Sequence, residues 1–303
     1  MRSGFWIAAA AAGLFIAMLG QPAAAGNVDW RDSSRSGRVI VPPGAKSFTR
    51  KVDGRRVVYV TPDVDSATPT PLLLVLNYKG GNPGTMANLA YAGEHAAKGE
   101  YFAFPESSGW AWNNGEQLNG NPQRDLRFLA DVIADAVANA NVDPARIAIS
   151  GYSSGGFMAN LFACERPDLV IGLGMVAAAQ LKSDDAICQP RSNFKAVFFN
   201  GTSDDVVRYN GTYHVHSAPE TLALWEGYLG CSGPEHQSQL PVQVKDRTSV
   251  AMTQISGCPA QLYTINKGGH TWPGGMDSPL SLSRTTQNID ATETLWQAFF
   301  GGS

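Results

Sequence analysis

The sequence predicts one domain built on a doubly wound, mostly parallel α/β sheet. The chain has 303 residues, of which 44% are hydrophobic and 16% charged, so it can form a large core and is too apolar to be disordered. Short apolar runs alternate with helical patterns over about 230 residues, which is typical of an α/β fold. Several runs are almost continuously apolar, as expected of strands buried on both faces.

Seven segments are short, apolar and rich in β-branched or aromatic residues, so we predict them as strands: 56–61, 72–77, 101–104, 146–150, 173–177, 195–200 and 261–266. Three segments have helical patterns: 124–140, 157–164 and 291–300. Pro122 marks the start of the first helix, and Asn121 is a candidate cap. Residues 106–120 and 233–256 are predicted as irregular insertions.

The N-terminus predicts export from the cytoplasm. Arg2 precedes an apolar run from Phe5 to Leu19, and small residues follow up to Ala25. This pattern is typical of a secretory signal peptide over 1–25. A membrane anchor is the alternative, but the run of about 15 residues is shorter than the roughly 20 needed to span a bilayer. Residues 26–50 are then an N-terminal extension before the domain over 51–303.

The charge distribution argues against binding to nucleic acid or to an anionic membrane. The net charge is −3, with 23 basic and 26 acidic residues, and the basic residues are scattered along the sequence. We expect no nucleic-acid partner, no stable membrane anchor and a monomer.

A G-x-S-x-G pattern follows the predicted strand 146–150. It consists of Gly151, Tyr152, Ser153, Ser154 and Gly155, with a helical pattern from Phe157. In this strand-turn-helix context a sharp turn lifts a nucleophilic serine above the sheet. We therefore predict Ser153 as the nucleophile, with the backbone N–H of Ser154 directed at a developing oxyanion.

A nucleophilic serine needs a base and an acid that orients the base. In an α/β-hydrolase these partners follow in the order Asp or Glu, then His, each after a strand end. The strand 195–200 leads into Asp204 and Asp205, and the strand 261–266 leads into His270. We predict His270 as general base and Asp204 as the orienting carboxylate, with Asp205 as the alternative.

The other histidines suggest no further site. His214 and His216 form an H-x-H pair without a third ligand cluster, which indicates a loop or surface role. His95 lies in a polar helical stretch and His236 in a loop, and both are expected to be solvated. We expect neither a metal nor a cofactor.

Several segments resemble the secreted poly(3-hydroxybutyrate) depolymerases, which are related to the feruloyl and acetylxylan esterases of carbohydrate esterase family 1. The resemblance runs from about Arg55 to Phe300 and is carried by the following segments: 142–147, 151–156, Met158 with Ala159, Ala163 with Cys164, 201–204, and Gly268-Gly269-His270-Thr271-Trp272-Pro273-Gly274-Gly275. It implies an α/β-hydrolase catalytic domain that cleaves carboxylic esters.

One segment departs from that family. Its members usually carry a His-Gly-Gly-Gly-Gly run that supplies a second oxyanion donor, where this chain has Asn77-Tyr78-Lys79-Gly80-Gly81-Asn82. The donor is then the backbone N–H of Tyr78 or Lys79. We also expect the Tyr78 ring to form one wall of the acyl pocket, with packing under the loop as the alternative.

Three tryptophans are candidate substrate-binding residues because aromatic rings suit flat or polymeric substrates. Trp110 and Trp112 lie in a Gly- and Asn-rich loop, and Trp272 follows His270 by two positions. For Trp272 a buried structural role fits equally well, and the exposed fraction of its side chain distinguishes the two alternatives.

The four cysteines allow three disulfide connectivities. Sequence proximity and the family resemblance both favour Cys164 with Cys188 and Cys231 with Cys258.

The predicted function is a secreted or periplasmic serine carboxylester hydrolase acting on poly- or oligo-hydroxyalkanoate esters through an acyl-enzyme. The alternatives are a feruloyl or acetylxylan esterase, a hydrolase of another polymer such as oxidised polyvinyl alcohol, and an inactive binding protein of hydrolase fold.

Overall fold

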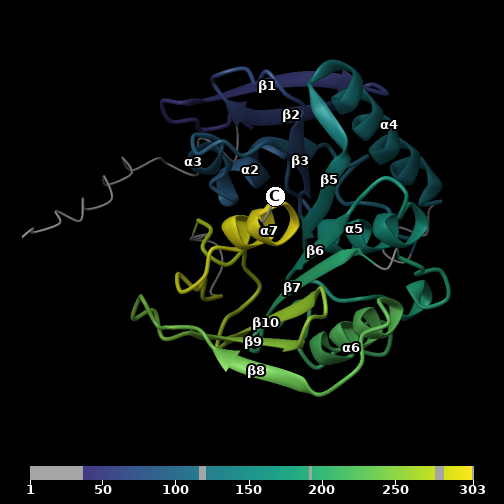
Figure 1. Cartoon of the computed structure of the whole chain (residues 1–303), viewed down its shortest axis with the longest axis vertical. Coiled ribbons are helices and arrows are strands. Elements are labelled where there is room, and N and C mark those ends of the chain that lie inside the picture. The colour runs from purple at the N-terminus through teal and green to yellow at the C-terminus, as the bar shows by residue number, and fades with distance from the viewer. Residues whose placement is uncertain (1–36, 116–120, 191–192, 277–282, 302–303) are drawn as a thin grey trace, which may run out of the picture.

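A single ten-stranded sheet forms the centre of the protein (Figure 1). The computed structural model describes residues 37–115, 121–190, 193–276 and 283–301, so the predicted signal peptide lies outside the described residues. The strands lie in the order β1-β2-β4-β3-β5-β6-β7-β10-β9-β8. Their bounds are β1 Ala45–Val52, β2 Arg55–Pro62, β3 Thr70–Leu76, β4 Phe102–Pro105, β5 Val142–Tyr152, β6 Gly172–Val176, β7 Lys195–Gly201, β8 Glu235–Gln239, β9 Ser249–Ile255 and β10 Ala260–Asn266.

The sheet confirms the predicted fold class. From β4 through β3, β5, β6 and β7 to β10, every neighbouring pair of strands is parallel. Antiparallel pairs extend both edges, with β1 and β2 on one side and β9 and β8 on the other. All seven predicted strands are present, each with ends shifted by a few residues.

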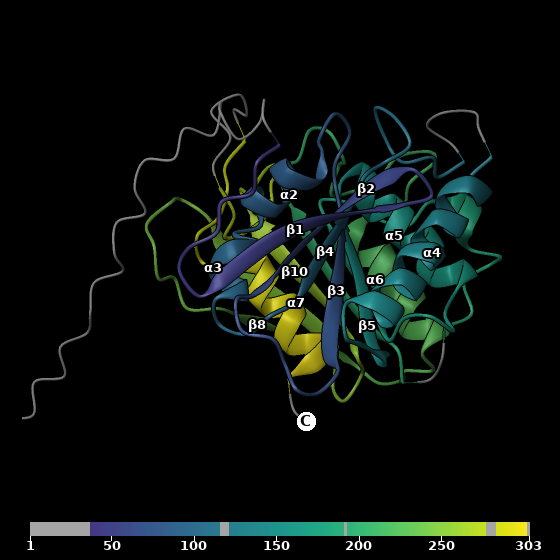
Figure 2. The same cartoon turned by 90° about the horizontal axis from the view of Figure 1, so that it is seen from above.

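Helices cover both faces of the sheet. Their bounds are α2 Pro83–Leu89, α3 Ala92–Ala96, α4 Gln123–Asn139, α5 Ser154–Glu165, α6 Ala218–Tyr228 and α7 Ala291–Phe300, with a short 3₁₀ helix η1 at Lys182–Asp184. Figures 1 and 2 show α4, α5 and α6 on one face and α2, α3 and α7 on the other. A separate hydrophobic core fills each interface: one includes Phe128, Phe162 and Trp225, and the other includes Met86 and Leu295.

The three predicted helices are confirmed as α4, α5 and α7. Pro122 is the residue that precedes the first turn of α4, and the Asn121 side chain accepts a hydrogen bond from the backbone N–H of Gln123. The helices α2, α3 and α6 are additional to these three, and α3 confirms the helical stretch expected around His95.

Two predicted boundaries are wrong. β1 begins at Ala45 and pairs with β2 along its whole length, so part of the predicted N-terminal extension belongs to the domain sheet. The predicted insertion 233–256 contains both β8 and β9. Every residue of β8 is exposed, so this edge strand lacks the apolar alternation by which strands are predicted.

Both predicted disulfides are present, linking Cys164 with Cys188 and Cys231 with Cys258. The first connects the last turn of α5 to the segment before β7, and the second connects the end of α6 to the turn between β9 and β10. Among the described residues, no helix is both long and apolar enough to cross a membrane.

Candidate active site

Ser153 occupies a strained turn between β5 and α5. Its backbone has φ 55° and ψ −119°, a combination that a residue with a side chain adopts only when its surroundings enforce it. A Cβ atom at Gly151 would collide with the backbone of Gly155, and one at Gly155 would collide with the carbonyl of Leu76. The glycines of the G-x-S-x-G pattern are therefore required by close backbone packing.

Ser153 and His270 line one cavity of about 690 Å³. The other lining residues come from the loops after β3, β4 and β7 and from the start of α5: Tyr78, Lys79, Trp110, Tyr152, Ser154, Phe157, Val206, Val207, Arg208, Thr212 and Val215. Because β3, β5, β7 and β10 are parallel, their carboxyl ends meet at this edge of the sheet, where α/β folds bind ligands.

Asp204, and not Asp205, contacts the imidazole of His270. His270 Nδ1–H donates to Asp204 Oδ2 at 2.8 Å. The other oxygen, Asp204 Oδ1, accepts from the backbone N–H groups of Val206 and Val207, each at 2.8 Å. This arrangement fixes the buried carboxylate and leaves His270 Nε2 as the basic nitrogen. The neighbouring Asp205 is exposed.

Backbone contacts hold the two loops that carry this pair. The N–H of Ser203 donates to the carbonyl of Gly268 at 2.8 Å, and the N–H of Lys267 donates to Thr202 Oγ1 at 2.8 Å. A Cβ atom at Gly201 would collide with the carbonyl of Gly268. The loops after β7 and β10 therefore lie close enough for Asp204 to reach His270.

Tyr152 also positions His270, a role that the sequence did not reveal. Its hydroxyl donates to the carbonyl of His270 at 2.8 Å, and its ring centroid lies 5.2 Å from that of the imidazole. Burial, with the charge of Asp204, raises the pKa of Tyr152, so the hydroxyl keeps the proton that it donates. The sequence feature that could have indicated this role is the position of Tyr152 directly before Ser153 in the G-x-S-x-G pattern.

The turn after β3 is fixed by its own hydrogen bonds. The carbonyl of Tyr78 accepts from the N–H of Gly81 at 2.9 Å and from Asn77 Nδ2 at 3.0 Å. The Tyr78 ring lies 5.3 Å from that of Tyr152 and borders the cavity. Lys79 borders the cavity too, and Ser154 stands at the first position of α5. All three predicted oxyanion donors are therefore residues of the cavity wall.

The three candidate tryptophans differ in position. Trp110 is 69% exposed and borders the cavity, and its carbonyl accepts from the N–H of Gly80 at 2.6 Å. Trp112 and Trp272 are fully buried, and their indole N–H groups donate to Asn77 O and Thr292 Oγ1. Substrate contact is therefore a wrong expectation for Trp112, because its side chain does not reach the surface. For Trp272 the alternative of a buried structural role is confirmed.

Asp125 in α4 anchors the loop that carries Trp110. Its carboxylate accepts from the N–H of Asn113 at 2.9 Å and from Ser108 Oγ at 3.2 Å, and it pairs with the buried guanidinium of Arg55. The exposed indole of Trp110 therefore stands on a loop tied to the core.

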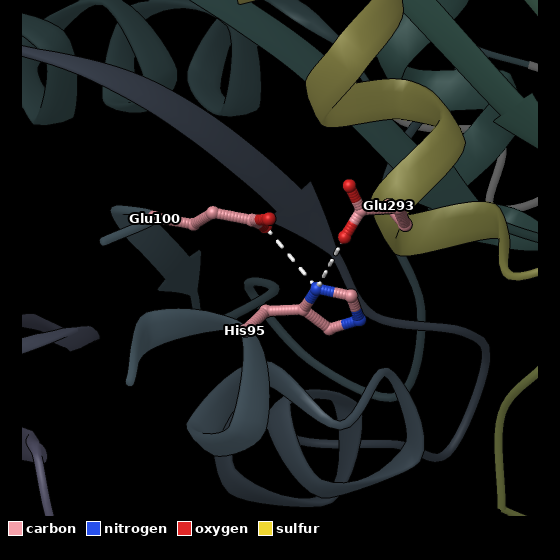
Figure 3. A group of neighbouring side chains, drawn as sticks. All are labelled: His95, Glu100 and Glu293. Atoms are coloured by element: carbon pink, nitrogen blue, oxygen red, sulfur yellow. Dashed lines mark ion pairs between the residues drawn. The ribbon is translucent and has the colours of Figure 1, made fainter. Parts of the chain in front are cut away.

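The prediction for His95 is also wrong. Its side chain is 2% exposed and faces the carboxylates of Glu100 and Glu293 (Figure 3). Its other ring nitrogen, Nε2, lies 3.0 Å from Asp290 Oδ2. Burial lowers the pKa of His95, but the neighbouring carboxylates of Asp290 and Glu100 outweigh burial and raise it to about 9.

Two further histidines are exposed. His214 lies in the loop before α6, and His236 lies in β8. His216 is half-buried and pairs with Asp185 at 2.9 Å. Of the described residues, only His95, Glu100 and Glu293 form a group that could hold a metal ion.

No family model matches the chain, but curated relatives do. It is 27% identical over 259 residues to the putative esterase NocK of Nocardia uniformis subsp. tsuyamanensis, covering 77% of this chain and 74% of the relative. It is 31% identical over 173 residues to feruloyl esterase B of Piromyces equi, covering 54% of this chain but only 31% of that protein. It is 24% identical over 258 residues to acetylxylan esterase A of Talaromyces purpureogenus, covering 79% of this chain and 60% of that protein.

The fold is that of an α/β-hydrolase. An acetyl xylan esterase from Aspergillus awamori superimposes with a TM-score of 0.59 at 17% identity, covering 75% of this chain and 94% of that structure.

Proposed function

We propose that this protein cleaves carboxylic esters through an acyl-enzyme, with Ser153 as nucleophile, His270 as general base and Asp204 as the residue that orients His270. One observation carries the proposal. His270 is hydrogen-bonded to the buried Asp204 and borders the same cavity as Ser153, which lies in a strained turn. A serine hydroxyl becomes an effective nucleophile in that combination. The coarse activity is supported by the relatives named esterases, and the chain is an ester-hydrolysing enzyme.

In the first step Ser153 Oγ bonds to the ester carbonyl carbon while its proton passes to His270 Nε2. The carbonyl oxygen becomes an oxyanion and accepts hydrogen bonds from the backbone N–H of Ser154 and of Tyr78 or Lys79. The intermediate then expels the alcohol, which takes the proton from His270. Water, deprotonated by the same imidazole, attacks the acyl-enzyme, releases the acid and restores Ser153.

The proposed substrates are oligomeric or polymeric hydroxyalkanoate esters. Two cations, Lys79 and Arg208, border a cavity whose other side chains are largely apolar, and none of the described lining residues is acidic. A hydroxyalkanoate oligomer combines an apolar chain with a terminal carboxylate, which matches this lining. The exposed Trp110 and Val206 at the cavity offer a further apolar surface for a longer chain.

Feruloyl or acetyl esters of polysaccharides are the second candidate. The names of the relatives favour them, and these substrates place no carboxylate beside the scissile ester. The two disulfides favour a working environment outside the cytoplasm, where such bonds persist, in agreement with the signal peptide predicted over 1–25.

A turnover panel distinguishes the candidates. We expect the highest kcat/KM on a linear 3-hydroxybutyrate trimer with a free carboxylate, a lower value on its methyl ester, and lower values again on methyl ferulate and p-nitrophenyl acetate. Highest turnover of methyl ferulate would replace the hydroxyalkanoate assignment by the second candidate.

Trp110→Ala is expected to raise KM for the trimer by about fivefold to tenfold, because the loss of an aromatic contact costs about 1 kcal/mol. Turnover of p-nitrophenyl acetate, which has no hydroxyalkanoate chain to pack on the indole, should stay unchanged. Tyr213→Ala is the matched control, because Tyr213 is exposed and is not among the cavity residues. Equal KM values of the two variants for the trimer would show that Trp110 does not contact the hydroxyalkanoate substrate.

A further inference from the structure

A group of one imidazole and two carboxylates, of which the imidazole and one carboxylate are buried, lies away from the cavity of Ser153. His95 belongs to α3, Glu100 to the segment between α3 and β4, and Glu293 to the first turn of α7. Figure 3 shows the three side chains converging, with His95 Nδ1 facing both carboxylates. None of the three borders the cavity of the proposed active site.

The Nδ1 atom of His95 has no hydrogen-bond partner although two carboxylates are near. Glu100 Oε2 lies 3.3 Å from it and Glu293 Oε2 lies 3.5 Å from it, yet Nδ1 and Glu100 Oε2 are both buried without a hydrogen bond. The three atoms lie within 4.8 Å of one another. Metal–ligand bonds of about 2.0–2.2 Å in a tetrahedral site place two ligand atoms about 3.4 Å apart, which matches the two spacings.

The other ring nitrogen is held as a metal-bound histidine requires. His95 Nε2–H donates to Asp290 Oδ2 at 3.0 Å, and Asp290 Oδ1 accepts from the N–H of Glu293 at 3.0 Å. Asp290 therefore fixes the ring orientation and holds the proton of Nε2, so that Nδ1 can bind a metal ion once its own proton is displaced, as with carboxylates behind metal-bound histidines.

The local charge favours a divalent cation. The carboxylates of Glu100, Asp290 and Glu293 surround one imidazole. Among the described residues, one ammonium pairs with this group, Lys98 Nζ, at 3.7 Å from Glu293 Oε2. Lys98 is 62% exposed and can turn into solvent. The three carboxylates carry three negative charges, and a protonated imidazole with Lys98 compensates only two of them. A divalent ion bound to the neutral imidazole, together with Lys98, compensates all three.

We propose that His95 Nδ1, Glu100 Oε2 and Glu293 Oε2 bind a zinc ion that links α3 to α7. An imidazole with two carboxylates suits Zn²⁺, whereas Mg²⁺ and Ca²⁺ prefer oxygen ligands alone. Glu293 is 39% exposed, so water completes the coordination from that side. The site is independent of ester hydrolysis.

Zinc titration of the chelator-treated full chain by isothermal calorimetry tests the proposal. We expect one Zn²⁺ per chain, no comparable binding of Mg²⁺ or Ca²⁺, and a higher unfolding temperature with Zn²⁺. Glu293→Gln should weaken binding roughly 10- to 100-fold, and Asp290→Asn should weaken it by roughly tenfold through loss of ring orientation. His236→Gln is the matched control, because this histidine is exposed in β8, and it should leave the affinity unchanged.

Glu293 lies on a half-exposed helix position, so its variant is expected to fold, which circular dichroism checks. His95→Gln and Glu100→Gln provide the fully buried counterparts. Absence of Zn²⁺ binding, or equal affinity in the wild type and in Glu293→Gln, would overturn the proposal and leave a protonated His95 as the link between the helices.

Discussion

Ser153→Ala is expected to lower kcat on p-nitrophenyl acetate by about 10⁶-fold, because loss of a serine nucleophile removes the acyl-enzyme route altogether. The folded structure should be unaffected, since the change removes only one oxygen that borders an open cavity. Initial rates at saturating substrate, compared with a far-ultraviolet circular dichroism spectrum, measure both effects.

Ser238→Ala is the matched control for this experiment. Ser238 lies in the exposed edge strand β8, so its removal should leave kcat within a factor of about two, as expected of a surface substitution. If Ser153→Ala kept more than a tenth of the wild-type rate while folding normally, Ser153 would not be the nucleophile.

Asp204→Asn is expected to lower kcat by about 10⁴-fold. An asparagine amide can present its NH₂ group to His270 Nδ1 and so favour the tautomer in which Nε2 carries the proton and cannot act as a base. The two backbone N–H groups that now bind Asp204 Oδ1 can still bind the amide oxygen, so the loop is expected to keep its shape.

Asp205→Asn tests the second of the two aspartates between which the sequence alone did not distinguish. Asp205 is adjacent and exposed, and its replacement should change kcat less than threefold, since an exposed charge contributes little to a buried contact. A larger loss in Asp205→Asn than in Asp204→Asn would mean that the loop rearranges when substrate binds.

The parts of the site that depend on local chemistry were predictable. Glycines at positions 151 and 155 are needed because backbone atoms touch there, so the elbow leaves a pattern in the sequence. The acid and base follow the ends of parallel strands, so their order along the chain indicates their meeting point. The choice between Asp204 and Asp205 depends instead on which carboxylate accepts hydrogen bonds from Val206 and Val207.

The side chains whose positions were predicted wrongly contact segments that are distant in the sequence. Trp112 looks like a binding residue in sequence, but Asn77 accepts its indole hydrogen bond inside the core. His95 lies in a polar stretch, yet α7, far along the chain, covers it. Partners of this kind become visible only when the fold brings the segments together.

The central claim is that Ser153 is an activated nucleophile. Intact-mass spectrometry after treatment with a fluorophosphonate ester tests it most directly, because the reagent phosphonylates only a serine that has a functioning base. We expect one adduct on the wild type, located by peptide mapping at Ser153, and none on Ser153→Ala. An unlabelled wild type of native fold, or equal labelling of both proteins, would contradict it and favour a binding protein of hydrolase fold or another nucleophile.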